Sequence, residues 1–224
     1  MISIIIPVLN EEKTIGKNLE RLAKIRGQKE IIVVDGGSID STVEIANKYA
    51  RVIKSEKGRG RQMNAGAKAS KGNILWFVHS DSILDEDSLA KIEKTIENGY
   101  IGGCFKLYFY DLDTKFMRFV SNSSNKRAKH FKLIFGDQGI FMKRDIFENL
   151  GGYKDMELME DWEFSRRIHR LGKMKVLDKR IGTSGRRFEK GGQVKTLLKM
   201  HKIKLLYILG MSPDKLARIY KEVR

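Results

Sequence analysis

A histidine and an aspartate, His79 and Asp81, come directly after the apolar run Ile74 to Val78. Five apolar residues between Gly72 and a polar cluster predict a strand that is buried on both faces, as in a parallel sheet. The carboxyl ends of such strands open toward the ligand crevice in α/β folds. An imidazole and a carboxylate at this edge could bind a divalent metal ion. Taken alone, Asp81 is more often a turn residue or a helix cap.

Three other polar segments lie at the same predicted edge of the sheet. They are residues 7–11 after the first strand, Asp35 at the end of the second, and the basic glycine-rich loop 57–66. An aspartate in that position can accept from a base N–H or a ribose hydroxyl, and Arg59 and Arg61 suit phosphate oxygens. The arrangement therefore predicts a nucleotide site.

The usual glycine signatures of phosphate binding are missing from the sequence. No GxGxxG follows the first strand and no GxxxxGK[ST] is present, which disfavours dinucleotide and P-loop sites. Mg²⁺ and Mn²⁺ prefer one or two carboxylates together with substrate phosphate oxygens. A divalent ion bridged by Asp81 is therefore the expected way to hold the phosphates.

In the second half of the chain, Glu160 and Asp161 are adjacent carboxylates at the predicted start of a helix. Carboxylates at a helix start interact favourably with the helix dipole, and this alone would explain their presence. A second polar glycine loop, Gly136-Asp137-Gln138-Gly139, precedes them and has no evident structural need for its polarity. We therefore interpret Asp161 and this loop as parts of a site.

These groups must be positioned by elements that alternate through the first half of the chain. Strands are predicted at 3–8, 30–34, 51–53 and 74–78, with helices between them that begin after Asn10, near Thr42 and after the basic loop. Asn10 is the expected cap of the first helix, with Glu11 and Glu12 in its first turn. The alternation predicts an α/β fold of three layers, α/β/α, with a mostly parallel central sheet.

The pattern becomes mixed after a helix that carries Leu89, Ile92 and Ile96. The elements expected beyond it are a strand at 103–110, helices at 114–130, 144–150 and 160–171, a strand at 174–177, and basic helices at 193–209 and 213–223. We predict one domain over 1–224: a nucleotide-binding half at about 1–98, an acceptor half at about 99–181 and basic helices at about 182–224.

At this point the sequence resembles the inverting glycosyltransferases of family 2, which have the GT-A fold. The resemblance extends from Ile4 to Tyr220, and more narrowly the chain is similar to a soluble subfamily named for arsenosugar biosynthesis or radical-SAM/selenodomain association. The matching segments are IIPVLNEE (5–12), VVDGGS (33–38), RQMNAG (61–66), HSD (79–81), GDQGIF (136–141), LMED (158–161) and TSGRR (183–187).

The resemblance implies a role for individual residues in a nucleotide-diphosphate sugar site, with UDP as the default nucleotide. Asp161 would be the catalytic base, and Asp81 the metal-binding end of a DxD motif whose first position is His79. The implied cofactor is Mn²⁺ or Mg²⁺, and the acceptor is unidentified. Around the donor the resemblance places Pro7, Leu9, Glu11, Asp35, Arg61, Ser80 and Asp81, and on the acceptor side Asp137, Gln138, Glu160, Arg186 and Arg187.

The composition leaves alternatives open. The net charge of +16 attracts nucleic acid, anionic lipid or phosphorylated molecules, but no nucleic-acid motif accompanies it, so no nucleic-acid partner is expected. One cysteine and no visible signal peptide favour a cytoplasmic protein. The basic C-terminal helices could make peripheral membrane contact or pack in a homodimer. A nucleotidyltransferase and a basic nucleic-acid-binding module remain alternative functions.

Overall fold

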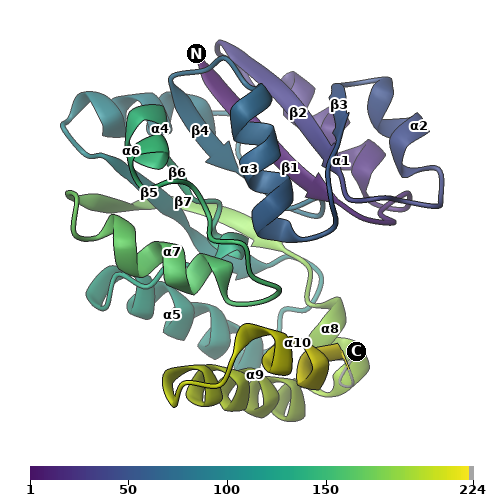
Figure 1. Cartoon of the computed structure of the whole chain (residues 1–224), viewed down its shortest axis with the longest axis vertical. Coiled ribbons are helices and arrows are strands. Elements are labelled where there is room, and N and C mark those ends of the chain that lie inside the picture. The colour runs from purple at the N-terminus through teal and green to yellow at the C-terminus, as the bar shows by residue number, and fades with distance from the viewer. Residues whose placement is uncertain (222–224) are drawn as a thin grey trace.

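The computed structural model describes residues 1–221, which form one mixed sheet flanked by helices (Figure 1). The sheet has seven strands in the order β3-β2-β1-β4-β6-β5-β7. The strands are β1 (Ile2–Val8), β2 (Lys29–Asp35), β3 (Arg51–Lys54), β4 (Ile74–Phe77), β5 (Gly102–Phe109), β6 (Phe141–Lys143) and β7 (Met174–Thr183). The helices are α1 (Ile15–Lys24), α2 (Thr42–Asn47), α3 (Arg59–Ala69), α4 (Ser88–Glu97), α5 (Lys115–His130), α6 (Arg144–Asn149), α7 (Glu160–Ile168), α8 (Arg186–Gly191), α9 (Gln193–Ile208) and α10 (Pro213–Lys221), with a 3₁₀ turn η1 (Gly136–Gln138).

All strands of the sheet except β6 run in one direction. β1 pairs in parallel with β2 and β4, and β7 pairs in parallel with β5. β6 is antiparallel to both of its neighbours, β4 and β5. The predicted α/β fold with a mostly parallel central sheet is confirmed.

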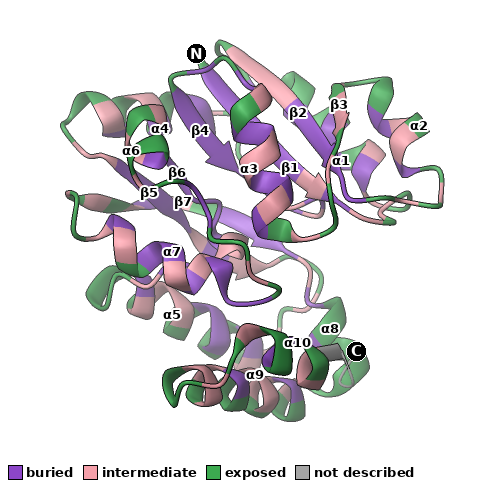
Figure 2. Cartoon of the chain, in the orientation of Figure 1, coloured by how far each residue is buried: buried purple, intermediate pink, exposed green. Residues whose placement is uncertain are grey.

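Successive residues of β1 point to opposite faces of the sheet, which creates two cores. Ile4 and Ile6 belong to a cluster with apolar residues of α1, α2 and α4. Ile5 belongs to a second cluster with residues of α3, α6 and α7. The strands are accordingly buried, while the outer faces of the helices are exposed (Figure 2). The predicted three layers are therefore present.

The first helix begins at Ile15, so the prediction that Asn10 caps it is wrong. Asn10 has a left-handed backbone with φ 54°, and its side chain accepts from the N–H of Ile39 at 2.9 Å. The N–H of Glu11 donates to Oγ1 of Thr42 at 2.7 Å. These bonds to Ile39 and to the first residue of α2 compete with helix formation, and they keep residues 10–12 out of α1.

Elements of the second half differ more from the sequence prediction. β7 continues to Thr183 rather than ending at Leu177, and neither β6 nor α8 was predicted. β7 is an edge strand, and charged residues such as Asp178 and Arg180 are exposed and interrupt its apolar pattern. β6 has three residues, too few for a periodic signal.

The C-terminal helices pack on other helices rather than on the sheet. Leu197 and Tyr207 of α9 join apolar clusters with residues of α5 and α7, whereas Leu198, Leu205 and Ile208 are exposed. Figure 1 shows α9 and α10 together at the end of the molecule away from the N-terminus. No helix within residues 1–221 has both the length and the hydropathy of a membrane span. The last two residues of the predicted helix 213–223 lie outside the described residues.

Candidate active site

Asp35 ends β2 at the edge of the sheet where the nucleotide site was predicted. The side chain is 2% exposed and accepts hydrogen bonds from the backbone N–H groups of Gly37 and Ser38, at 3.1 and 3.0 Å. The residues expected beside it, Pro7, Leu9 and Glu11, lie at the end of β1, which pairs with β2. The loops after the two strands thus form one continuous edge, as the sequence predicted.

Helix α3 is fastened to both of these strand ends by residues of the RQMNAG segment. Nε2 of Gln62 donates to the carbonyls of Val8 and Val34, each at 2.8 Å. A Cβ on Gly66 would lie 2.4 Å from Ile5, so only glycine permits this close contact between helix and sheet. The sequence analysis quoted this segment as a nucleotide motif, and the structure gives these two residues a packing role.

Arg59 and Arg61 lie in the first turn of α3, not in a glycine loop. Nε of Arg61 is 2.6 Å from Oδ1 of Asp155, and its Nη1 is 3.2 Å from Oε1 of Glu157. Nε of Arg59 is 2.9 Å from Oε1 of Glu160. Both arginines therefore connect the nucleotide half to residues 155–160, which lead into α7. The side chain of Arg61 points toward this segment.

The loop after β4 places His79 and Asp81 in different surroundings. Nδ2 of Asn18 holds the loop by donating to the carbonyls of His79 and Ser80, at 3.2 and 2.9 Å. A Cβ built on Gly136 would lie 2.9 Å from Nε2 of His79, so this imidazole faces η1. Asp81 instead faces α8. The two side chains thus have different neighbours, and a metal ion shared by both stays a prediction.

His79 is a neutral imidazole beside the predicted base. Burial lowers the pKa of His79 to about 4, and the positive charge of Arg59 acts in the same direction, while Asp161 opposes it. A neutral imidazole can donate from one nitrogen and accept at the other. His79 can therefore bind a hydroxyl between the two halves of the site.

Asp81 lies close to Arg186 and Glu11. Nη2 of Arg186 is 3.9 Å from Oδ2 of Asp81 and 3.2 Å from Oε1 of Glu11. Burial raises the pKa of Asp81, and the nearby carboxylate of Asp111 acts in the same direction. A cation near Asp81 would offset that repulsion.

The protein ligands available to a metal ion are few. Within residues 1–221, no three histidine, cysteine, aspartate or glutamate side chains gather in a way that could hold one. Mg²⁺ and Mn²⁺ commonly bind through one carboxylate, water and substrate phosphate oxygens. The half-buried carboxylate of Asp81 fits that kind of binding, so the ion would depend on the bound diphosphate for its other ligands.

Asp161 is held in a fixed orientation by two backbone donors. The N–H of Gly136 donates to Oδ2 at 3.0 Å, and the N–H of Trp162 donates to Oδ1 at 2.7 Å. Met159, just before α7, has a left-handed backbone with φ 71°. η1 and the first turn of α7 thus fix this carboxylate beside His79. Each oxygen keeps a lone pair that can accept a proton.

Glu160 has a different environment from its neighbour Asp161. It is 2% exposed, and burial raises its pKa while Arg59 opposes the shift. The ion pair with Arg59 uses this carboxylate to connect α7 to α3. The structure therefore gives Glu160 a positioning role in place of the acceptor contact that the sequence predicted.

The loop residues Asp137 and Gln138 also have different environments. Gln138 is fully buried, and its Oε1 accepts from Nη2 of Arg127 at 3.2 Å, so it lies in the interior and not in the cleft. Oδ1 of Asp137 is buried and accepts no hydrogen bond within residues 1–221. Burial raises the pKa of Asp137, against the attraction of Arg127. Asp137 is the member of the pair that has a free acceptor for a ligand.

The two C-terminal arginines point in different directions as well. Arg186 contacts Glu11 and Asp81, as a residue close to the diphosphate would. The guanidinium of Arg187 lies 5.2 Å from the ring centroid of Tyr220, on α10. Arg187 also contributes to the low pKa of His79.

Two charged residues near the site were missed by the sequence analysis. Arg127 of α5 and Lys204 of α9 both interact electrostatically with Asp137 and Asp161. They are 77 positions apart and belong to helices that look like ordinary basic amphipathic segments. Only the packing of α9 against α5 and α7 brings them together, so no spacing in the sequence could have identified them.

Comparison with known proteins gives a family match over two thirds of the chain. The family model described as "Glycosyl transferase family 2" matches residues 3–151. A "Probable glycosyltransferase YdaM" of Bacillus subtilis is 26% identical over 76% of this chain. A "PGL/p-HBAD biosynthesis glycosyltransferase" of Mycobacterium bovis is 30% identical over 75% of this chain and 69% of its own length. The chain spans 47% of the B. subtilis protein, about half its length.

Solved structures show the same fold at low sequence identity. TarS 1-349 of S. aureus superposes with a TM-score of 0.66 at 21% identity, covering 83% of this chain and 61% of that one. The mannosyltransferase PcManGT of Pyrobaculum calidifontis, solved with GDP-Man and Mn²⁺, has a TM-score of 0.65 at 17% identity, covering 99% and 69%. The fold is that of the GT-A glycosyltransferases.

Proposed function

Because the chain belongs to glycosyl transferase family 2, we propose that it is an inverting enzyme that moves a sugar from a nucleotide-diphosphate sugar to an acceptor hydroxyl. The observation that carries the proposal is Asp161, oriented by two backbone N–H groups next to the strand end that holds Asp81. A fixed carboxylate opposite a diphosphate site is the arrangement that direct displacement requires.

In the proposed reaction the acceptor oxygen attacks the anomeric carbon of the donor sugar. A C–O bond forms to the acceptor while the bond to the diphosphate oxygen breaks, and the electron pair leaves with the nucleoside diphosphate. Asp161 accepts the hydroxyl proton on a carboxylate oxygen. A single displacement inverts the anomeric configuration. His79, neutral beside Asp161, and Asp137, with its unpartnered Oδ1, orient the hydroxyls that meet there.

The donor would lie along the carboxyl ends of β1, β2 and β4. Pro7, Leu9 and Asp35 are proposed to surround the base and ribose, with UDP as the first nucleotide to test. Asp81 would hold a divalent ion, which when bound neutralises charge on the leaving diphosphate. Arg186 supplies a further positive charge at this place, because it already lies between Glu11 and Asp81.

Sugar transfer is favoured over the two alternatives that the sequence left open. A nucleotidyltransferase has no use for a base at Asp161, and the family match names glycosyl transfer. The family match gives no support to the alternative of a nucleic-acid-binding module. The narrower resemblance to the arsenosugar or selenodomain subfamily stays a prediction, as do cytoplasmic location and a homodimer.

Calorimetric titration of UDP, GDP and dTDP tests the donor site, each with Mn²⁺ or with EDTA. We expect one nucleotide to bind in a metal-dependent manner and to lose at least about tenfold in affinity in Asp81→Asn, since a charge-assisted contact contributes roughly 1.5–3 kcal/mol. Asp85→Asn, an exposed aspartate of the same loop, is the matched control and should bind as wild type does. Absence of nucleotide binding under all conditions would contradict the proposal.

A further inference from the structure

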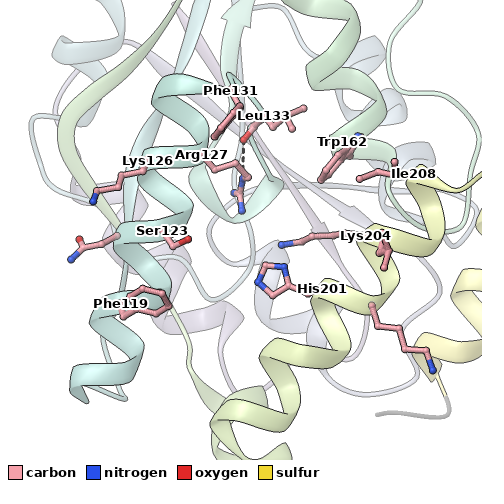
Figure 3. Close-up of a pocket in the computed structure, with 13 residues that line it drawn as sticks. Phe119, Ser123, Lys126, Arg127, Phe131, Leu133, Trp162, His201, Lys204 and Ile208 are labelled. Carbon is pink, nitrogen blue, oxygen red and sulfur yellow. Dashed lines mark hydrogen bonds between the residues drawn. The ribbon is translucent and has the colours of Figure 1, made fainter.

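A groove of about 730 Å³ lies between α5 and α9 (Figure 3). One of its lining residues, Lys204, interacts electrostatically with the proposed base Asp161. Its volume is in the range of small-molecule sites in proteins. Trp162, the residue after Asp161, forms part of its wall. Its apolar lining consists of Phe119, Phe131, Leu133, Trp162, Leu205 and Ile208.

The charges of the groove all have one sign. Lys126, Arg127, Lys202 and Lys204 line it, and among residues 1–221 no carboxylate does. Figure 3 shows Arg127 and Lys204 pointing toward each other from α5 and α9. Both lie over the ring of Phe135, at 3.9 and 4.8 Å from its centroid. Within residues 1–221 neither forms an ion pair with a carboxylate, and Lys204 donates no hydrogen bond.

The two facing cations are held together at a cost. Burial lowers the pKa of Lys204 to about 8, and the charge of Arg127 acts in the same direction, while the carboxylates of Asp137 and Asp161 offset the shift only in part. Burial also lowers the pKa of Arg127. Arg127 cannot move away, because its Nε donates to the carbonyl of Leu133 at 3.1 Å and its Nη2 to Gln138. An anion between Arg127 and Lys204 would offset the repulsion and the desolvation of both.

The apolar residues of the groove are unusually exposed for side chains of their size. Phe119, Phe131, Leu205 and Ile208 are 64%, 74%, 57% and 64% exposed. These four of the chain's exposed large hydrophobic side chains surround a single groove, which indicates a binding surface rather than scattered apolar residues. A second copy of the chain is a poor occupant, since it would bring the same positive charges against each other.

We propose that this groove binds the acceptor of the glycosyl transfer, and that the acceptor is an amphiphile with a phosphate head and an apolar chain or ring. The proposal rests on the function proposed above and names the substrate class for the same site. The phosphate lies between Arg127 and Lys204, and the apolar part lies along Phe119, Phe131, Trp162 and Ile208. A dianionic phosphate matches the four cations better than a carboxylate does. The hydroxyl to be glycosylated lies at the head-group end, where Trp162 leads to Asp161.

Calorimetric titration with n-octyl phosphate tests this proposal, with n-octanol and inorganic phosphate as the two partial ligands. We expect octyl phosphate to bind at least about tenfold more tightly than either. It contacts both the cations and the apolar side chains of the groove, whereas each partial ligand contacts only one of these two parts. Lys204→Gln should weaken binding about tenfold or more. Lys195→Gln, an exposed lysine on the same helix, is the matched control and should change nothing.

Other outcomes would overturn the acceptor class. They are octanol binding as tightly as octyl phosphate, an equal effect of Lys204→Gln and Lys195→Gln, or binding to vesicles of anionic lipid without binding of octyl phosphate. Arg127→Gln is a second variant, with its thermal unfolding measured first because Arg127 also holds Leu133 and Gln138. The nucleotide titration on the same preparation separates the two proposals. Nucleotide binding without octyl phosphate binding overturns the acceptor class and leaves sugar transfer in place.

Discussion

Asp35, the last residue of β2 in the nucleotide half, and Asp137, in the 3₁₀ turn η1 of the acceptor half, are both carboxylates, yet their surroundings differ. Asp35 is 2% exposed and accepts from two backbone N–H groups two and three residues further along the chain. Oδ1 of Asp137 is buried without a hydrogen bond, and the charges around it come from α3, α5, α7 and α9. Asp35 is held by its neighbours in sequence, whereas Asp137 lies among charges that distant elements bring together.

This difference indicates which half of the protein gains more stability from a bound ligand. A carboxylate that its own loop satisfies is ready for a ligand and stable without one. Charges such as Asp137, Arg127 and Lys204 are less well satisfied, so we expect a bound acceptor to stabilise that half more than a nucleotide stabilises the other. The predictions below test the difference in order of decreasing effect.

The largest effect is expected from Asp161→Asn. Loss of a general base lowers turnover by about 10²–10⁴-fold, and the amide keeps the shape of the side chain. Release of nucleoside diphosphate from the donor sugar measures turnover, and calorimetry should show unchanged nucleotide binding. Asp178→Asn, an exposed aspartate, is the control. Equal turnover in the Asp161 variant and wild type would remove the base from the mechanism.

Breaking the ion pair between the halves should cost stability. Arg59→Met leaves Glu160, whose side chain is 3% exposed, without its cation. We expect the free energy of unfolding to fall by about 2–3 kcal/mol. This is less than for a fully buried pair, because the Arg59 side chain is 44% exposed. Arg61→Met, whose partners Asp155 and Glu157 are exposed, should cost under about 1 kcal/mol. Urea unfolding measures both.

The cost of Arg59→Met should depend on pH. Burial raises the pKa of Glu160 in the folded protein above its unfolded value of 4.5, so the folded state binds more protons and stability falls as pH rises through this range. Without Arg59 the pKa rises further. The loss should therefore be larger at pH 8 than at pH 5, and a loss that grows on acidification would contradict this account.

His79, between the halves, should make the protein sensitive to acid. Its pKa falls from 6.5 to about 4 on folding, so the unfolded chain binds more protons between these values and stability falls as pH is lowered. Wild type should lose about 2 kcal/mol more than His79→Gln between pH 7 and pH 4. Urea unfolding across that range measures it, with the exposed His130→Gln as control. Parallel pH profiles for wild type and His79→Gln would mean that folding leaves this imidazole unchanged.

The smallest effects compare the two aspartates directly. Asp35→Asn should cost about 1–2 kcal/mol, because two backbone N–H groups lose a charged acceptor. Asp137→Asn should be neutral or stabilising, and more so at pH 8 than at pH 5, because burial raises the pKa of Asp137 and disfavours its charged form. Urea midpoints at the two pH values measure both. A similar loss in the two variants would show that the halves hold their carboxylates in the same way.

Much of the nucleotide half could be predicted because its signals are local. The apolar run 74–78 identifies β4. Ile15, Leu19 and Leu22 recur at spacings of four and three, which is typical of the buried side of a helix, and all three are buried in α1. The start of α1 was predicted wrongly, since a contact 29 residues away holds Asn10 in a left-handed conformation. The edge strand β7 was predicted too short, because its exposed face carries charged residues.

The sequence by itself determined the α/β class, the end of β2 at Asp35, the loop after β4 that carries Asp81, and the family, from which the role of Asp161 as the base is proposed. Those features depend on hydrophobic periodicity and short motifs, which act over a few residues. Only the tertiary structure decided that His79 faces Asp161 and not Asp81, that Glu160 pairs with Arg59, and that Gln138 is buried. It also brought Arg127 and Lys204 together. Such contacts join helices far apart in the chain, and their energies depend on burial and charge that exist only once the layers have packed.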